Sequence, residues 1–349
     1  MSVLTAERVA AQALVDGRAR RRRARRRAVL ALAVLVVVLF VVSLMVGRTF
    51  YPLGDVVRVV LGQDVPGASF TVGELRLPRA VLAVLTGAAF GLGGVTFQTM
   101  LRNPLASPDI IGVTSGASVA AVIGIVVLSL DETLVSIAAM AAALSTALVI
   151  YLLAFTDGVV GTRLILVGIG VAAMLDSVVA YVIVRAAPWD LQDALRWLTG
   201  SLNGATWDQV VPLAVGLALL TPLLLGQARN LALLQQGDDS ATALGVRVER
   251  TRLVTLVTAV ALVSFATAAA GPIAFVAFLS GPIAARVVRG GDSLMLPAAL
   301  VGALLVCGAD LLAQHALGAR YPVGVVTGAL GAPFLLHLLI RSHQTGGSL

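Results

Sequence analysis

The chain has 349 residues, of which 58% are hydrophobic and 12% are charged, and its formal net charge is +7. A soluble domain carries about 25% charged residues. A soluble chain as apolar as this one would expose large hydrophobic patches and aggregate. The composition therefore argues against a soluble globular protein and predicts a polytopic membrane protein.

The basic residues are all arginines, and a dense run of them occupies Arg18–Arg27, directly before the first apolar segment. Taken alone, such a run is also typical of nucleic-acid-binding arms. Next to a span it predicts a cytoplasmic anchor that sets orientation and contacts anionic lipid, so we expect membrane lipid and no nucleic acid as a partner. The apolar segment is longer than the apolar region of a typical signal peptide, and it ends in GRTFYPLGD, without an A-x-A cleavage pattern, so a retained first span is expected rather than a signal peptide.

Ten segments are apolar and long enough to cross a bilayer as helices, which need about 20 residues each. The seventh and eighth are separated only by Gly271-Pro272, and without that break the count would be nine. We expect an all-α membrane domain over residues 28–341, between a basic tail at 1–27 and a short tail at 342–349. The ten segments are approximately 28–47, 77–98, 108–129, 133–155, 163–185, 208–227, 252–271, 273–289, 295–313 and 323–340.

The distribution of arginine predicts the orientation of these spans. With the N-terminus inside, the inner segments hold 18 of the 25 arginines and the outer segments hold 7. Positive residues accumulate on the cytoplasmic side of membrane proteins. With an even number of spans, both termini are therefore expected in the cytoplasm.

The segment LRNPLASPDIIGVTSGAS between the second and third spans is predicted to be a short inner turn. Arg102-Asn103-Pro104 closes the second span, because a proline disfavours helix at the residue before it. Ser107 is a suitable N-cap and Pro108 occupies the favoured first helical position. We expect the third span to start there.

A second polar inner segment, residues 228–251, contains a predicted short amphipathic helix from Asp238 to Leu244. Gly237 and Asp238 provide a start, and Gly245 is suited to the position after the helix end. A short helix held on the cytoplasmic face suits contact with a soluble partner. On the outer side, Leu191–Leu198 is predicted to lie on the membrane surface.

Two acids, Asp176 and Asp310, fall inside predicted spans, where charged groups are costly. One interpretation is a proton or cation relay; the other is a structural acid paired with a hydroxyl, a backbone group or an arginine. Glycines four residues apart, such as Gly87 and Gly91, predict close helix packing in lipid. The single Cys307 and three scattered histidines give no metal-binding spacing and no redox pair, so no metal site is expected.

Five sequence motifs of the chain resemble those of a known family. The motifs RLPR, LTGAAFGLGGVTFQTMLRNPLASPDIIGVTSGAS, LGVRVERTRL, GPIAFVAF and YPVGVVTGALGAPFLLHLL occur in order over about 270 residues. Together they are similar to the FecCD/BtuC-type permeases of ABC importers for iron–siderophore complexes, heme and vitamin B12. The resemblance implies ten spans, a second identical or related permease subunit, a separate ATP-binding subunit and an extracytoplasmic solute-binding protein. It also implies a bacterial plasma membrane location.

The resemblance implies roles for particular residues. Arg76 and Arg79 match the RLPR arginines that meet acidic residues of the binding protein, and Arg320 is a third candidate at the outer mouth. The inner segment matches the helix that docks on the ATPase; its candidate contacts are Asp238, Asp239, Ala241, Leu244 and Gly245. No cofactor is expected on this chain, which has no G-x-x-x-x-G-K-[ST] loop; ATP and Mg are expected on the partner ATPase.

The chain departs from the family pattern at Gln314, where an arginine is common, in Ser280–Arg286, which has lost a histidine, and at Gly93. The RWLTGSL and FLSGPIAAR blocks favour a ferric siderophore as substrate, with heme or vitamin B12 as the alternative. An ion-coupled secondary transporter, relying on Asp176 and Asp310, is the rival class. A membrane-embedded enzyme is disfavoured because GVTSG fails the G-x-S-x-G pattern.

Overall fold

The computed structural model describes residues 2–154, 161–288 and 293–344, and within these residues every regular element is a helix. A π-helix, η1 (Ser69–Arg76), and a 3₁₀ turn, η2 (Pro108–Ile111), accompany the α-helices. The α-helices are α1 (Ser2–Met45), α2 (Leu53–Val60), α3 (Leu77–Met100), α4 (Val113–Val126), α5 (Glu132–Ala154), α6 (Gly161–Val184), α7 (Pro188–Thr199), α8 (Trp207–Gly226), α9 (Ala228–Leu234), α10 (Asp238–Ala243), α11 (Val248–Ala270), α12 (Val276–Val287), α13 (Met295–His315) and α14 (Val323–Gln344).

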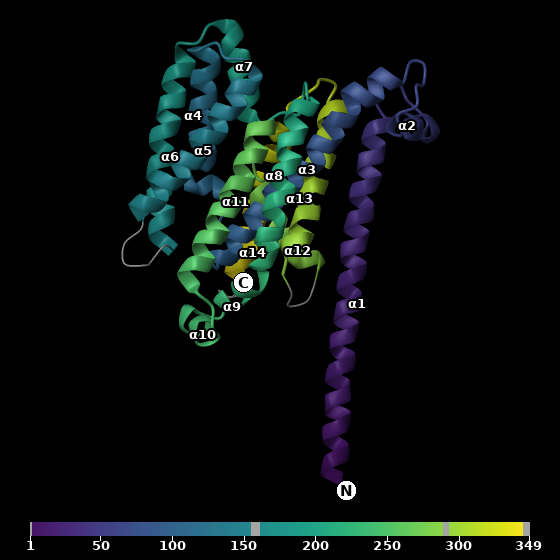
Figure 1. Cartoon of the computed structure of the whole chain (residues 1–349), viewed down its shortest axis with the longest axis vertical. Coiled ribbons are helices and arrows are strands. Elements are labelled where there is room, and N and C mark those ends of the chain that lie inside the picture. Colours follow the sequence, from purple (N-terminus) through teal and green to yellow (C-terminus); the bar gives the residue numbers. More distant parts are fainter. Residues whose placement is uncertain (1, 155–160, 289–292, 345–349) are drawn as a thin grey trace.

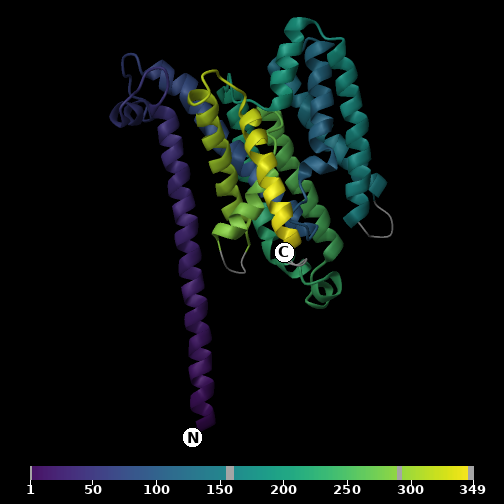
Figure 2. The ribbon, with the colours of Figure 1, turned by 180° about the vertical axis from the view of Figure 1, so that it is seen from behind.

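The first helix, α1, is continuous from the arginine-rich tail into the first span. Its 44 residues correspond to a length of about 66 Å at 1.5 Å per residue. The N-terminal part extends away from the other helices, whereas the apolar part runs alongside them (Figures 1 and 2). At the boundary between the two parts, the Arg25 guanidinium donates to the Ser293 carbonyl oxygen at 2.7 Å.

The expected spans each coincide with an apolar helix. Seven helices of the described residues are long and apolar enough to cross a membrane, and three shorter apolar helices lie at 113–126, 276–287 and 323–336. The expected break is present, since α11 ends at Ala270 and Gly271 has a φ of 71°. A multi-pass helical membrane protein is thus confirmed, while the exact number of crossings and the cytoplasmic location of both termini stay predictions.

The predicted start of the third span at residue 108 is wrong. Ser107 does cap a helical turn and Pro108 does occupy its first position, but this turn is the four-residue η2. Gly112 then adopts a left-handed conformation, with a φ of 75°, and the α-helix begins only at Val113. A left-handed residue ends regular hydrogen bonding, so the regular α-helix of this segment is the 14-residue α4.

The core consists of α3 and its neighbours α11, α12 and α13. The most apolar stretch of α3 is 78% buried within the chain. Two glycines of α3 make the close contact with α13 possible. A Cβ on Gly87 would lie 2.4 Å from the Gly302 carbonyl oxygen, and one on Gly91 would lie 2.2 Å from that of Ala298. The prediction of close helix packing at Gly87 and Gly91 is therefore confirmed.

Helices α4, α5, α6 and α7 form a second group beside this core, on the side opposite to α1 (Figures 1 and 2). Contacts of α11 with α4 and α5 join the two groups. The outermost helix is α6, and only 11% of its most apolar stretch is buried within the chain. A large apolar surface therefore remains available to lipid or to another subunit.

Candidate sites at the two ends of helix α3

The C-terminal end of α3, which the predicted orientation places on the cytoplasmic side and which is called its inner end here, terminates in a Schellman motif with an unusual residue. The Asn103 N–H donates to the Gln98 carbonyl at 3.1 Å, and the Arg102 N–H points to that of Thr99 at 3.4 Å. The first position after the helix end in this motif, whose residue donates the second of these bonds, normally holds glycine because its φ is positive. Here it holds Arg102, with a φ of 51°. A non-glycine residue in this region costs about 1–3 kcal/mol, so other contacts must stabilise it.

Those contacts are made with the short helix α10. The Arg102 guanidinium forms an ion pair with Oδ1 of Asp238, and the Arg252 guanidinium pairs with Oδ2 of the same carboxylate at 2.7 Å. Asp238 therefore joins the end of α3 to the start of α11. The turn is braced from inside as well, since the Leu105 N–H donates to Oδ1 of Asn103 at 2.9 Å.

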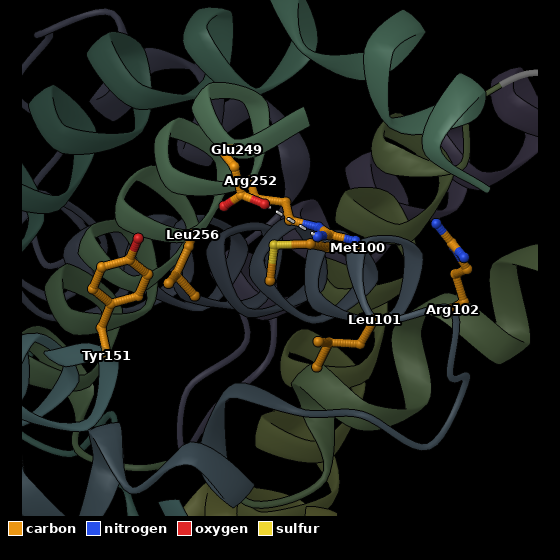
Figure 3. A pocket seen from close by; sticks show the side chains of 7 residues that line it. All are labelled: Met100, Leu101, Arg102, Tyr151, Glu249, Arg252 and Leu256. Carbon is orange, nitrogen blue, oxygen red and sulfur yellow. Dashed lines mark ion pairs between the residues drawn. The ribbon is translucent and has the colours of Figure 1, made fainter. Parts of the chain in front are cut away.

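Beside this ion-pair cluster lies a cavity of about 170 Å³. Figure 3 shows Arg102 at one end and Tyr151 at the other, with Arg252 between them and its ion pair to Glu249 drawn as a dashed line. In this ion pair, Nη1 of Arg252 lies 3.6 Å from Oε1 of Glu249. The lining residues are Met100, Leu101, Arg102, Tyr151, Glu249, Arg252 and Leu256. The cavity thus separates the inner ends of α3, α5 and α11.

The helix expected at Asp238–Leu244 is present as α10, and Gly245 follows it with a φ of 85°, as predicted. Leu244 is 60% exposed, so its apolar side chain is free to contact a partner. Asp239 is also exposed. Ala241 is fully buried against the rest of the chain, so its assignment as a partner contact is wrong.

At the outer end of α3, Arg79 forms a nearly buried ion pair with Asp310 of α13. Its Nε and Nη2 donate to the two carboxylate oxygens at 3.0 and 2.7 Å, and Nη1 donates to Oδ1 of Asn203 at 2.8 Å. Gln314 donates to the same carboxylate at 2.6 Å. Only 15% of the Arg79 side chain and 4% of the Asp310 side chain are exposed.

This geometry changes the interpretation of three predicted residues. Of the two alternatives for Asp310, the structure shows an acid paired with an arginine. The Arg79 side chain is bound to Asp310 and Asn203 within the chain, so it is not an exposed docking residue. Arg76 donates to the carbonyls of Leu44, Met45 and Thr49 at 2.9, 3.0 and 2.7 Å, so it caps the end of α1.

The remaining predicted residues lie apart from this network. Arg320 is exposed in the loop after α13, where binding-protein docking stays a prediction. Asp176 is exposed near the middle of α6, and its side chain forms no ion pair or hydrogen bond with the described residues. The departures in Ser280–Arg286 lie in α12, where the Ser280 hydroxyl donates to the Val276 carbonyl at 2.6 Å. No group of three potential metal ligands occurs among the described residues.

Sequence reasoning missed Asn203, Gln314 and Arg252 as members of these two clusters. One signal was available: Gln314 follows Asp310 by four residues, which places both side chains on one helix face. No local signal links Arg79 to Asp310 or Arg102 to Asp238, because those partners are separated by 231 and 136 residues.

Comparison with known proteins agrees with this architecture. A family model described as the FecCD transport family matches residues 35–341. The ferric enterobactin transport system permease protein of Escherichia coli K12 is 40% identical over 305 residues, covering 86% of this chain and 92% of that protein. The cobalamin import system permease protein of Halobacterium salinarum is 37% identical over 275 residues, covering 78% and 74%. A solved inward-facing structure of a metal-chelate type ABC transporter matches with a TM-score of 0.81 at 26% identity, covering 90% of this chain and 99% of its own.

Proposed function

Because the chain belongs to the FecCD transport family, we propose that it is the membrane permease subunit of an ABC importer that moves ferric siderophore complexes into the cytoplasm. The observation that carries the energy-coupling part of this proposal is the exposed Leu244 beside α10, a helix fixed to α3 and α11 through Asp238. Such a helix offers a rigid, partly apolar surface to a cytoplasmic subunit.

The proposed partners follow from this arrangement. An ATP-binding subunit, carrying ATP and Mg, would dock on α10 from the cytoplasm. A solute-binding protein would deliver the iron chelate to the outer mouth near Arg320. A second permease subunit, identical or related, would cover the exposed face of α6, because an unpaired carboxylate such as Asp176 is costly against lipid.

The choice of substrate rests on the relatives. The ferric enterobactin permease matches more of this chain, and at higher identity, than the cobalamin permease does. We therefore favour a ferric siderophore. Cobalamin, or heme, is the second candidate within the same family.

Competition for uptake tests this choice. Cells that lack their own importers would express the chain with its ATPase and binding protein and would be given a radioiron-labelled siderophore. We expect uptake that excess unlabelled ferric siderophores abolish and that excess cobalamin or heme leaves unchanged. Failure to take up the labelled siderophore, together with uptake of labelled cobalamin or heme by the same cells, would establish the second candidate.

A further inference from the structure

Helix α3 is held by charged side chains at both of its ends. Arg102, two residues beyond its inner end, pairs with Asp238 of α10. Arg79, in its first turn, pairs with Asp310 of α13 and donates to Asn203 in the loop after α7. The helix between these arginines runs through the core next to α13 (Figure 1). Its 24 residues correspond to about 36 Å.

The middle of α3 is a continuous helix that is packed tightly against α13. Its single proline, Pro78, lies at the start, where it does not interrupt the helix. The backbones at Gly87 and Gly91 touch those of Gly302 and Ala298 in α13. Packed interiors transmit displacement because they deform little. If the inner end of α3 is displaced, we therefore expect its outer end to be displaced as well, and α13 to move with it.

Arg102 is the residue whose presence most needs an explanation. The position after a helix end with a positive φ favours glycine, and arginine is strained there. Strained residues persist where a function or other contacts require them. Among the described residues, the charged partner of Arg102 is Asp238, the first residue of α10. Figure 3 shows its side chain next to the cavity that separates α3 from α5 and α11.

We propose that α3 carries movement of α10 to the outer mouth, with Arg102 and Arg79 as the positioning residues at its two ends. ATP-driven displacement of α10 would pull the inner end of α3 through Asp238 and Arg102. The outer end would then move Asp310 and the loop that holds Asn203 through Arg79. This inference rests on the proposed function, since it needs an ATPase on α10 and a binding protein outside.

The test uses the complete importer in lipid vesicles, with ATP hydrolysis measured with and without the loaded binding protein. Arg102→Gly is the informative variant, because glycine suits the positive φ and preserves the turn while removing the guanidinium. We expect the ATPase to copurify and to keep its basal rate, and the stimulation by binding protein to fall by about five- to tenfold. Arg102→Lys, which keeps the charge, should retain part of the stimulation. Arg250→Ala, which removes an exposed arginine near α10, is the matched control and should behave like the wild type.

Full stimulation in Arg102→Gly would overturn the proposal. Loss of ATPase copurification would overturn it as well, because Arg102 would then hold the docking surface together instead of transmitting its movement. If the wild-type complex itself shows no stimulation, the proposed function fails, and the two failures are thereby distinguished.

A double variant tests whether the two ends belong to one path. Arg79→Lys keeps a positive charge but loses the bidentate hydrogen bonding to Asp310. Distant independent sites have additive free energies, so their fold losses multiply. A shared path predicts that Arg102→Gly combined with Arg79→Lys loses no more stimulation than the more affected single variant. Losses that multiply would show that the ends act separately.

Discussion

At the scale of single residues, the same residue type has two different uses in this chain. Arg79 and Arg320 were both predicted to face the binding protein, but only Arg320 is exposed. Arg79 is directed inward because α3 and α13 pack so closely that Asp310 lies within hydrogen-bond distance. The sequence motif identifies the arginine correctly, whereas the partner is determined by a tertiary contact across 231 residues.

The Arg79–Asp310 pair should matter for folding more than for docking. Arg79→Ala leaves the Asp310 carboxylate with Gln314 as its remaining side-chain donor in the network, and breaking a buried pair costs about 3–5 kcal/mol. We expect a clearly lower midpoint of thermal unfolding for the purified protein in detergent. Arg320→Ala, which removes an exposed arginine, is the control and should leave the midpoint unchanged. An unchanged midpoint in Arg79→Ala would contradict the assignment.

At the scale of elements, local signals predicted helix ends well where a single residue decides them. The break at Gly271, the cap at Ser107 and the glycine after α10 were all visible in the sequence. The start of α4 was missed because the residues PDII are compatible with a regular helix and nothing local requires the left-handed Gly112. The burial of Ala241 was missed because nothing in the local sequence shows which side of this short helix packs against the rest of the chain.

The docking surface beside α10 can be tested at this scale. Leu244→Glu places a charge on the exposed apolar side chain expected to meet the ATPase, and an unpaired charge in an interface is unfavourable. The expected result is loss of ATPase copurification from membranes at unchanged permease abundance. Gln236→Glu adds the same charge at an exposed position just before α10 and should preserve the complex. Copurification that survives Leu244→Glu would remove Leu244 from the interface.

At the scale of the whole molecule, composition and periodicity predicted a helical multi-pass protein, and the order of motifs predicted its family. The contacts between α3 and α13, and the separation of α4–α7 into a second group, depend on packing between distant segments and were not predictable from one sequence. The exposed face of α6 shows that a single chain leaves apolar surface uncovered, which agrees with the proposed second permease subunit.

The rival to an ABC importer at this scale is an ion-coupled transporter that uses intramembrane acids. Asp310 is occupied by Arg79 and Gln314, so it does not resemble a relay group. Asp176 is the remaining acid within a predicted span, and its side chain has no ion pair or hydrogen bond among the described residues. A relay through Asp310 is therefore disfavoured by the geometry, and the source of energy is the sharpest difference between the two classes.

The most direct test is iron-chelate uptake into vesicles that contain the permease and its ATPase, with the loaded binding protein at the outer face of the permease and ATP at the face that carries α10. The account predicts uptake that requires ATP and persists when an uncoupler collapses the ion gradients. Uptake that proceeds without ATP and stops on addition of the uncoupler would contradict it.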